Sequence, residues 1–562
     1  MSTFNLIDEP WISVVTDYKG TTKLVGLKEF FQNAHTYIAL AGDMPTQDFA
    51  VMRFLLAILH TVFSRYDAHG EVYEMIEVND RMQQVEKVYE EDEEEYEDAL
   101  METWRDLWTA EKCPDIVVQY LETWHDRFYL FDEKYPFYQV TEKEIDASRM
   151  SKSEPSKILG KNINRLISES GNKMALFSPK FDRENNKEIL AYDEVARWLI
   201  TFQSYTGLSD KVIFGKEKYK ASKGWLFDLG GVYLSSDHLY KTLILNLVLV
   251  NTSNGGYNAN IERPSWEYSP SEWIDRSMHS SIIDNIAELY TVWSRAIHIN
   301  GFEPDEPFAM GIVKLPEILH ENNYLEPMTV WRYNKTGDSK GKYTPRKHQL
   351  NKSLWRSFGL ITKTEAADEG NQNMPKRRPG IIDWLNHIDR YIPHEFVHIN
   401  SISMEDDGNA TSWVPTNEIM DSLCMEGAII NDVADQGWVV RINDTIDRTK
   451  DVVDKTYRGF LNDVKKIRNI ESGDFTSKYI ETMYFELDKP FRDWIAGIDY
   501  QDDKDEKIER WNATLKKLVI TQAKKIVEDA GPRDFTGIIE NDSVRNIATA
   551  FNSFMLRIHK IL

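Results

Sequence analysis

The stretch at residues 444–469, DTIDRTKDVVDKTYRGFLNDVKKIRN, decides how the C-terminal part of the chain folds. Apolar residues recur in it every three or four positions, and charged residues fill most of the positions between them. This spacing predicts one long amphipathic helix that buries a single stripe of side chains. The stripe consists of Ile446, Val453, Tyr457, Phe460, Val464 and Ile467.

Three further segments of the same kind follow, at residues 475–495, 507–529 and 543–562. Gly473 separates the first two helices, and the pair Gly531-Pro532 ends the third. Each helix is too polar on its outer face to be stable alone. Four amphipathic helices with short connections therefore predict an antiparallel four-helix bundle over residues 421–562.

Residues 1–420 show a different pattern, in which short strands alternate with helices. Thr46 resembles an N-cap for a long apolar helix. The expected fold class is therefore α+β, with a large mixed α/β N-terminal domain at residues 1–420 followed by the bundle. The expected strands lie at residues 4–15, 23–26, 137–140 and 289–299, and the expected shorter helices lie at residues 27–33, 192–205 and 239–250.

The composition indicates the cellular compartment in which the protein is expected. The 562 residues include only two cysteines, Cys113 and Cys424, which form no disulfide framework and no CxxC zinc motif. The N-terminus has no basic segment followed by an apolar core, and the densest apolar run, residues 243–250, is shorter than the ~20 residues of a membrane span. A cytoplasmic protein without membrane attachment is expected.

Charge is unevenly distributed along the chain, which has a formal net charge of -24. Residues 71–110 hold fifteen acidic and three basic residues, with a centre at residues 90–98, EEDEEEYED. We interpret this run as a solvated helix face or loop that also disfavours non-specific nucleic acid. Residues 149–180 carry a net +5 and residues 331–360 a net +7. Basic tracks on an acidic body predict contact with a polyanion at selected places.

The most concentrated basic segment is KVIFGKEKYKASKGW at residues 211–225, which we call the lysine loop. Its lysines are opposed by one acid, Glu217, and Gly215 and Gly224 lie among them. Lysines attract phosphates, and glycine lets the main chain approach a groove closely. The lysine loop therefore predicts a nucleic-acid contact, with a plain solvated loop as the alternative. Its five lysines are Lys211, Lys216, Lys218, Lys220 and Lys223.

An HExxH sequence, HEFVH at residues 394–398, raises a competing hypothesis. On a helix, His394 and His398 would bind zinc beside a catalytic glutamate, and Glu418 would supply a third ligand. The flanking residues favour a strand, on which the two histidines would lie ~13 Å apart, too far to share one zinc ion. A zinc metallopeptidase is kept as an alternative. Walker A, dinucleotide-binding and GxSxG motifs are absent from the sequence, so a non-enzyme without cofactor or metal is predicted.

Several short segments resemble one family. LIDEPWISV at residues 6–14 resembles the opening of CasA, the large subunit of type I-E CRISPR Cascade complexes, with one extra residue before Trp11 and Ser13 in place of a proline. YPFYQ at residues 135–139 looks like the H-P-F-x-Q segment of that family, and LYTVWSRAIHI at residues 289–299 is similar to one of its central strands. With the C-terminal helices, the resemblance covers nearly the whole chain.

The resemblance implies a non-catalytic subunit at the 5′-handle end of a CRISPR RNA-guided complex. Such a subunit inspects double-stranded target DNA from the minor groove for a short flanking motif, the PAM, and then inserts a wedge that starts unwinding and R-loop formation. The implied partners are the CRISPR RNA, the backbone, 5′-handle and small subunits of Cascade, target DNA, and a helicase-nuclease that the subunit helps to recruit. An RNA-binding scaffold without DNA sensing is a further alternative.

Positions that match the family's functional segments follow from the resemblance. A glycine loop falls at Phe214, Gly215 and Lys216 of the lysine loop. The family's E-K-F-T strand matches residues 326–329, where proline replaces lysine, so Arg332 or Lys335 would substitute. The wedge turn falls at Gly408, Asn409 and Ala410, in the segment EDDGNATSW.

Two further sets complete the prediction. Residues 148–187, which we call the docking loop, are expected to be a long loop that docks on RNA and neighbouring subunits through Lys161, Arg165, Lys173 and Phe177. DNA-backbone contacts are predicted at Lys218 and Lys220 and, in the bundle, at Lys465, Lys466, Lys516, Lys517, Lys524 and Lys525. For the bundle lysines, ordinary surface residues opposite a core stripe are the alternative. Some members of the family bind zinc through paired cysteines, which this chain lacks.

Overall fold

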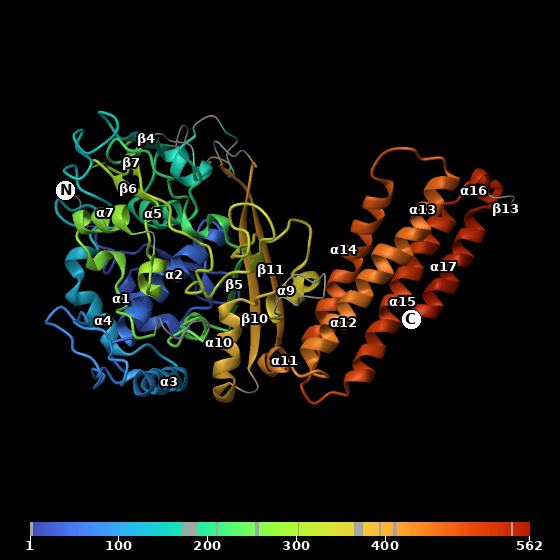
Figure 1. Ribbon diagram of the computed structural model, residues 1–562, viewed down its shortest axis with the longest axis horizontal. Helices are drawn as coiled ribbons and strands as arrows, with labels where there is room; N and C mark the ends of the chain where they lie inside the picture. The colour runs from blue at the N-terminus through green and yellow to red at the C-terminus, as the bar shows by residue number, and fades with distance from the viewer. Residues whose placement is uncertain are drawn as a thin grey trace. The chain divides into compact units, whose positions relative to one another are not determined.

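The computed structural model consists of two compact units, shown from blue to red along the chain in Figure 1. The first comprises Met1–Asn351, Lys363–Tyr391 and Ile399–Ser422, and the second Lys352–Thr362, Ile392–His398 and Leu423–Leu562. The structure describes residues 4–170, 173, 176, 188–208, 212–252, 258–280, 282–301, 303–364, 375–392, 395–408, 413–540 and 543–562.

The first unit begins with a small antiparallel sheet in the order β2-β1-β3. The predicted helix at residues 27–33 is confirmed, and the strand predicted at 23–26 is found one residue earlier. The strand predicted at 4–15 is shorter than expected: it begins after Pro10, and the Trp11 indole donates to the carbonyl oxygen of Leu6 (2.9 Å). The elements are β1 (Ile12–Val15), β2 (Thr22–Val25), α1 (Leu27–Asn33) and β3 (Ala39–Leu40).

Helix α2 (Pro45–Phe63) forms the centre of the first unit. It is the one helix in the described part of the chain that is long and apolar enough to cross a membrane, but it is almost wholly buried as a core helix. The predicted cap is wrong, because α2 begins one residue before Thr46. Thr46 instead donates its backbone N–H (2.9 Å) and hydroxyl (2.7 Å) to Glu418. A carboxylate beside the first turn complements the helix dipole.

Several shorter helices belong to the first unit, and α5 and α8 among them pack directly on α2. The acidic run lies at the start of α3, where Tyr96, Leu100 and Trp104 form a buried stripe and the acids remain outside. The helix predicted at 239–250 ends early, at Leu245. These helices are α3 (Glu93–Ala110), α4 (Asp115–Thr123), α5 (Tyr192–Tyr205), α6 (Leu239–Leu245), α7 (Pro270–His279), α8 (Ile286–Tyr290) and α10 (Gly380–Ile388).

The strands of the first unit form several small antiparallel sheets rather than one large sheet. Of the strand predicted at 289–299, only Arg295–His298 is a strand, because α8 occupies the beginning of that segment. No strand exists at 137–140, where Tyr138 has a left-handed φ of 54°. The sheets are β4-β7-β6 (Ser156–Leu159, Ala309–Lys314, Arg295–His298), β11-β10-β5 (Pro415–Glu426, Phe396–Asp406, Gly231–Ser235) and the hairpin β8-β9 (Trp331–Tyr333, Tyr343–Pro345).

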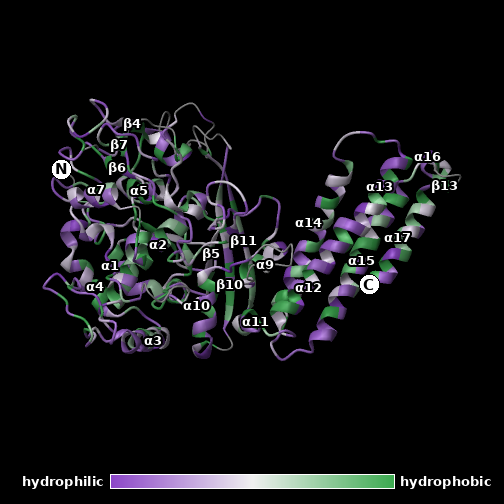
Figure 2. Cartoon of the chain, viewed as in Figure 1, coloured by the Kyte–Doolittle hydropathy of each residue, from purple (hydrophilic) through white to green (hydrophobic). Residues whose placement is uncertain are grey.

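The second unit is dominated by the C-terminal helices, along which hydrophobic and hydrophilic residues alternate (Figure 2). Every member of the predicted stripe from Ile446 to Ile467 is buried. The first helix runs from α12 through a π-helical segment into α13. The sequence did not predict the small hairpin β12-β13. The elements are α9 (Phe358–Thr362), α11 (Gly427–Asn431), α12 (Trp438–Asp451), the π-helical segment (Val452–Tyr457), α13 (Arg458–Ile467), α14 (Phe475–Ala496), α15 (Lys504–Glu528), α16 (Pro532–Thr536), β12 (Ile538–Glu540), β13 (Ser543–Arg545) and α17 (Ile547–Ile561).

Candidate nucleic-acid interface

The first half of the lysine loop is attached to the protein by its backbone. Phe214 pairs with Met150 in an isolated bridge, and the N–H of Gly215 donates to the carbonyl oxygen of Arg149 (2.8 Å). Gly215 has a φ of 65°, which residues with side chains rarely adopt, and no atom lies within 4 Å of the place that a Cβ would occupy. A short, anchored turn that is open on the side where a Cβ would lie is thus available at the predicted position.

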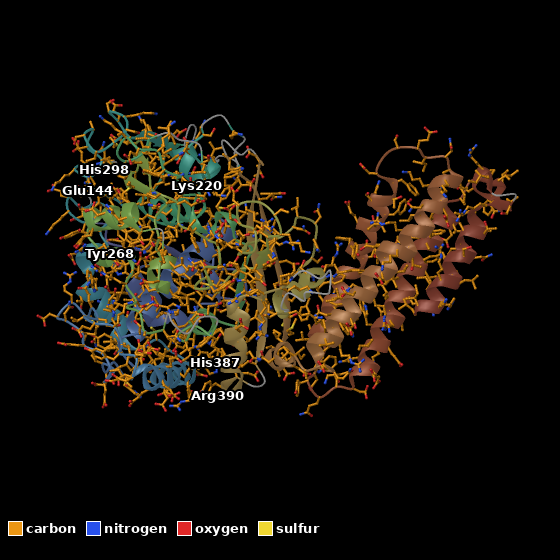
Figure 3. The ribbon with its side chains drawn as sticks, viewed as in Figure 1. Glu144, Lys220, Tyr268, His298, His387 and Arg390 are labelled. Atoms are coloured by element: carbon orange, nitrogen blue, oxygen red, sulfur yellow. The ribbon has the colours of Figure 1, made fainter. Side chains whose placement is uncertain are left out.

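Three lysines after this turn are exposed: Lys216, Lys218 and Lys220. Lys220, marked in Figure 3, pairs with Glu317 (2.6 Å), but its side chain is 79% exposed. Such a pair contributes little in water, so the ammonium group can exchange it for a phosphate. The predicted phosphate-binding lysines are therefore accessible.

The side chain of Tyr219 holds the lysine loop in place through two hydrogen bonds. Its hydroxyl accepts a hydrogen bond from the backbone N–H of Phe214 (3.0 Å) and donates one to the carbonyl oxygen of Lys314 (2.6 Å). Burial raises the pKa of Tyr219 to about 12, so the hydroxyl keeps the proton that it donates. The aromatic residue between the lysines thus anchors the loop.

The second half of the lysine loop belongs to the core. The side chain of Lys223 is 15% exposed, pairs with Asp228 and lies 4.2 Å from the ring centre of Trp413. Burial opposes ionisation of Asp228, yet Lys223 and other nearby cations hold the pKa of this carboxyl below its usual range. The Trp225 indole donates to Glu326 (2.6 Å). Lys223 therefore differs from the three lysines before it.

Arg332 and Lys335 are exposed on the hairpin β8-β9 and the connection that follows β8. The preceding segment, matched to the family's E-K-F-T strand, is core. Glu326 is buried in a bidentate pair with Arg53 (2.8 and 2.7 Å), and Thr329 is fully buried. Only the residues after this segment can reach a ligand at the surface.

The predicted wedge turn connects β10 to β11. Gly408 is exposed with a φ of 68° and has open space around it. Asn409 and Ala410 lie outside the described residues. The two acids before Gly408 both bind lysines: Asp406 pairs with Lys347 (2.5 Å), and Asp407 with Lys173 (2.6 Å). These pairs reduce the repulsion that the acids alone would exert on DNA.

The described part of the docking loop contains two elements that were not predicted, β4 and a π-helical segment, Asn162–Leu166. Lys161 is half-buried, and Lys173 binds Asp407, whereas Phe177 lies outside the described residues. For Arg165, the structure differs from the predicted surface contact with RNA. Arg165 is 4% exposed, and burial lowers its pKa, so its guanidinium does not lie at the surface as an RNA contact requires.

The structure brings together segments that are distant in sequence. Lys173 of the docking loop binds the wedge turn, and Lys223 of the lysine loop lies against Trp413 at the far side of that turn. Lys347, which was not among the predicted contacts, pairs with Asp406 and lies 4.1 Å from the ring centre of Phe227. Its place in the basic stretch 331–360 was the one available signal.

The predicted lysines of the C-terminal helices lie on the outer faces of α13 and α15. Lys465 and Lys516 are half-buried, and Lys516 donates to the backbone oxygen of Leu562 (3.2 Å). The other four, Lys466, Lys517, Lys524 and Lys525, are exposed. Both a DNA-backbone contact and an ordinary helix surface are compatible with this placement.

The described residues of the HExxH segment, 395–398, do not form the helix that a zinc peptidase needs. His398 lies on strand β10, as the flanking residues predicted, and His394 lies outside the described residues. The carboxylate of Glu418 accepts hydrogen bonds from Thr46 at the start of α2. Within the described ranges, no group of three or more His, Cys, Asp or Glu residues is placed to hold a metal ion.

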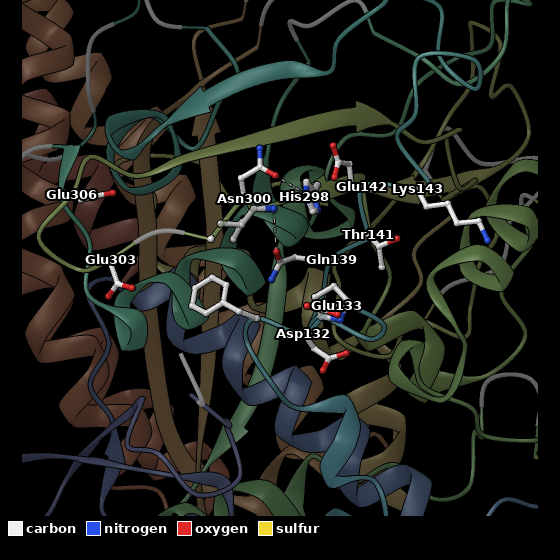
Figure 4. Close-up of a pocket in the computed structure, with 14 residues that line it drawn as sticks. Asp132, Glu133, Gln139, Thr141, Glu142, Lys143, His298, Asn300, Glu303 and Glu306 are labelled. Atoms are coloured by element: carbon white, nitrogen blue, oxygen red, sulfur yellow. Dashed lines mark hydrogen bonds between the residues drawn. The ribbon is translucent and has the colours of Figure 1, made fainter. Parts of the chain in front are cut away.

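A pocket of about 650 Å³ lies elsewhere in the first unit (Figure 4). His298 contributes its two ring nitrogens to contacts with Val140 (2.9 Å) and Asn300 (2.8 Å). Lys143 is the one lysine of the lining, and five carboxylates give the pocket a negative charge that repels phosphate. The acidic lining residues are Asp132, Glu133, Glu142, Glu303 and Glu306. This pocket contains none of the predicted DNA contacts.

Comparisons with known proteins agree on one family. The sequence profile of the family "CRISPR-associated protein Cse1" matches residues 5–522. The curated CasA/Cse1 protein of Thermus thermophilus is 27% identical over 364 residues, which cover 64% of this chain. The match spans 60% of the length of that relative.

Solved structures share the fold over nearly the whole chain. Thermobifida fusca Cse1 superposes with a TM-score of 0.75 at 23% identity, covering 99% of this chain and 98% of the other. Acidimicrobium ferrooxidans Cse1 gives a TM-score of 0.70 at 18% identity, covering 100% and 98%. A chain of a CRISPR RNA-guided surveillance complex gives 0.56 at 12% identity, covering 99% of each chain. At these identities the likeness establishes the fold alone.

Proposed function

The chain belongs to the CRISPR-associated Cse1 (CasA) family, as its sequence resemblance indicated, and on this premise we propose that it is a non-catalytic subunit of a CRISPR RNA-guided surveillance complex of type I-E. Its expected partners are the CRISPR RNA, the other Cascade subunits and double-stranded target DNA, in the cytoplasm. One of the solved structures that share the fold is a chain of such a CRISPR RNA-guided surveillance complex, which supports this assignment.

Within that complex, the proposed role is recognition of the PAM from the minor groove. The observation that carries this proposal is the anchored turn at Gly215, followed by three exposed lysines. A glycine with open space around it lets the backbone approach the narrow groove, while Lys216, Lys218 and Lys220 meet the phosphates beside it. Arg332 and Lys335 of the β8-β9 region are proposed as additional contacts.

The wedge is proposed at Gly408, Asn409 and Ala410. Lys173 and Lys347 neutralise the two acids before this turn, so DNA can approach it. An amide side chain at Asn409 would then occupy the space of a base at the edge of the target and start R-loop formation. Recruitment of the helicase-nuclease follows from the same family assignment.

The C-terminal helices are proposed to form the predicted antiparallel four-helix bundle, with the domain boundary near residue 420. Lys466, Lys517, Lys524 and Lys525 would hold DNA phosphates there. Lys161 and Lys173 of the docking loop would face RNA or a neighbouring subunit, and Phe177 is proposed with them. Arg165 is excluded from this set by its burial.

Target binding by the RNA-loaded complex lacking this subunit tests the proposal. Purified protein is added back, and only the base pairs that flank the target are varied. The expected result is an affinity gain of about tenfold or more on some flanks, and its loss in Asn409→Ala. Asn417→Ala, an exposed asparagine on β11, is the matched control.

The alternatives predict other outcomes of the same experiment. An RNA-binding scaffold would improve complex assembly with no dependence on the flanking base pairs. A zinc peptidase would carry stoichiometric zinc that disappears in His394→Ala. Either result would replace the proposed function.

A further inference from the structure

A buried arginine contacts the loops of the candidate interface. Arg295 stands on β6, in the apolar stretch 289–299, and its side chain is 0% exposed. Strand β6 is an edge of the sheet β4-β7-β6, and helix α5 lies close to this sheet (Figure 1). A buried guanidinium needs acceptors for its five N–H groups, so its partners indicate what it holds.

The guanidinium of Arg295 binds three segments of chain. One Nη group donates to the carbonyl oxygen of Ser222 in the lysine loop (2.6 Å), and the other to the carbonyl oxygen of Gly207 just before that loop (2.8 Å). The Nε group pairs with Glu169 of the docking loop, which is itself 2% exposed. One side chain thus connects the docking loop to the end of the lysine loop and to the segment that precedes it.

Arg295 is itself fixed from the opposite side. The side-chain amide of Gln203 on α5 donates to the carbonyl oxygen of Arg295 (2.8 Å) and accepts from its N–H (3.0 Å). Arg295 also pairs with Lys314 in the register of β6 and β7. A helix and a sheet therefore hold the arginine, and the two loops are attached to it.

Lys314 adds to the same arrangement. Its ammonium group lies 4.0 Å from Glu169, its carbonyl oxygen accepts from Tyr219 (2.6 Å), and its N–H donates to Val212 (3.0 Å). The start, middle and end of the lysine loop are thus all bound to Lys314 or Arg295.

The wedge turn is connected through Gly207. A Cβ at this position would lie 1.9 Å from the carbonyl oxygen of Trp413, so no side chain fits between them. The segment after the wedge turn therefore packs directly on the residue whose carbonyl oxygen binds Arg295.

We propose that Arg295 and Glu169 form a positioning pair that fixes the docking loop and the lysine loop relative to each other, so that engagement of the docking loop sets the geometry of DNA sensing. A buried ion pair adds little stability over apolar residues of the same size. Here the pair of Arg295 and Glu169 supplies directional hydrogen bonds to backbone carbonyl groups of irregular segments. The DNA part of this proposal rests on the proposed function.

Hydrogen exchange of the full-length protein tests the structural part without DNA. Glu169→Gln keeps the size of the side chain but removes its charge. Arg295→Lys keeps the charge, but an ammonium cannot reach all three acceptors. Glu267→Gln is the matched control, because it weakens another fully buried pair, Arg65–Glu267, that touches neither loop.

We expect amide exchange in both Glu169→Gln and Arg295→Lys to accelerate about tenfold in the two loops together. The reporting amides are Ser222 and Gly224 in the lysine loop and Ser168 and Leu176 in the docking loop. These amides should be unchanged in Glu267→Gln. Loosening of one loop alone, of neither loop, or of both loops equally in the control would overturn the proposal.

Flank discrimination tests the functional part. We expect Arg295→Lys to enter the RNA-loaded complex yet to show a several-fold smaller affinity ratio between preferred and disfavoured flanks. An unchanged ratio would refute the coupling to DNA sensing. If wild type itself shows no flank dependence while the exchange result holds, the proposed function fails and the positioning pair stands.

Discussion

The basic side chains of the first unit fall into two sets with opposite surroundings. Lys216, Lys218 and Lys220 are exposed on the lysine loop, whereas Arg53, Arg65 and Arg295 are buried against carboxylates. The exposed lysines are available to a phosphate, because breaking a solvent-exposed ion pair costs little free energy. The buried set maintains the structure, because each guanidinium would otherwise be an unpaired charge in the core. Lys223 lies between the two sets.

The largest effect is expected where a buried pair is broken. In Glu326→Gln, Arg53 loses its bidentate partner, and we expect the free energy of unfolding to fall by about 3–5 kcal/mol. Burial opposes ionisation of Glu326, but Arg53 holds its pKa below the usual range, so the pair is ionised in the fold. Urea denaturation at neutral pH measures the loss. A change below about 1 kcal/mol would show that the buried set is dispensable.

A half-buried carboxylate that is held by backbone N–H groups should behave differently with pH. Burial raises the pKa of Glu262 from 4.5 to about 7, although the N–H groups of Ile286 and Ala287 donate to it. Because the folded state keeps the proton to higher pH than the unfolded state, the free energy of unfolding should fall as the pH rises from about 4.5 to 7, by about 1–3 kcal/mol.

Urea denaturation of wild type and Glu262→Gln at pH 5 and pH 7 measures this dependence. The substitution should reduce the difference between the two values. Burial also raises the pKa of Asp48 to about 7, so a part of the dependence should remain and should decrease in Asp48→Asn. A wild-type stability that rises over this range would contradict both assignments.

Lys223 should give an intermediate effect. Its ammonium pairs with Asp228 and lies over Trp413, so Lys223→Ala is expected to cost about 1–2 kcal/mol in urea denaturation. Lys220→Ala, which removes an exposed pair from the same loop, should cost less than about 0.5 kcal/mol. Equal losses would remove the distinction between the two halves of the lysine loop.

The smallest effect on stability should come from the exposed set. The triple substitution Lys216→Ala, Lys218→Ala, Lys220→Ala should change unfolding by less than about 0.5 kcal/mol per site. It should weaken duplex binding by the assembled complex on every sequence and reduce the salt slope by about 2–3. The charge-matched control replaces three exposed lysines elsewhere, Lys19, Lys143 and Lys478. An equal change in the control would reveal a general charge effect.

The local sequence pattern predicted helices well where the apolar period of a single segment specifies the buried face. The stripe from Ile446 to Ile467 is buried as predicted, because a 3.6-residue period specifies the core face of a helix without reference to other segments. The boundaries of α1 and α5 were predicted for the same reason. The strand predicted at residues 137–140 failed, since short apolar runs carry no such period.

Predictions that depend on partners far along the chain were less complete. Thr46 is bound by Glu418, and Arg165 is buried in the docking loop although its charge suggested exposure. The sequence marked Lys347 only by its place in the basic stretch 331–360 and Arg295 only by its place in the segment 289–299, because their partners lie at distant positions. The DNA contacts proposed for Gly215 and Lys216 stay a prediction, which rests on the local glycine and lysines and on the family resemblance.

The sequence by itself determined the family, the helical character of the C-terminal part and the place of the lysine loop. These properties reside in short motifs, in periodicity and in local charge. Tertiary structure alone decided which cations face solvent, since that depends on which carboxylates and aromatic rings the fold brings to each one. It placed Lys223 over the ring of Trp413 and bound Arg295 to both loops, because burial of a charge requires partners that no single segment contains.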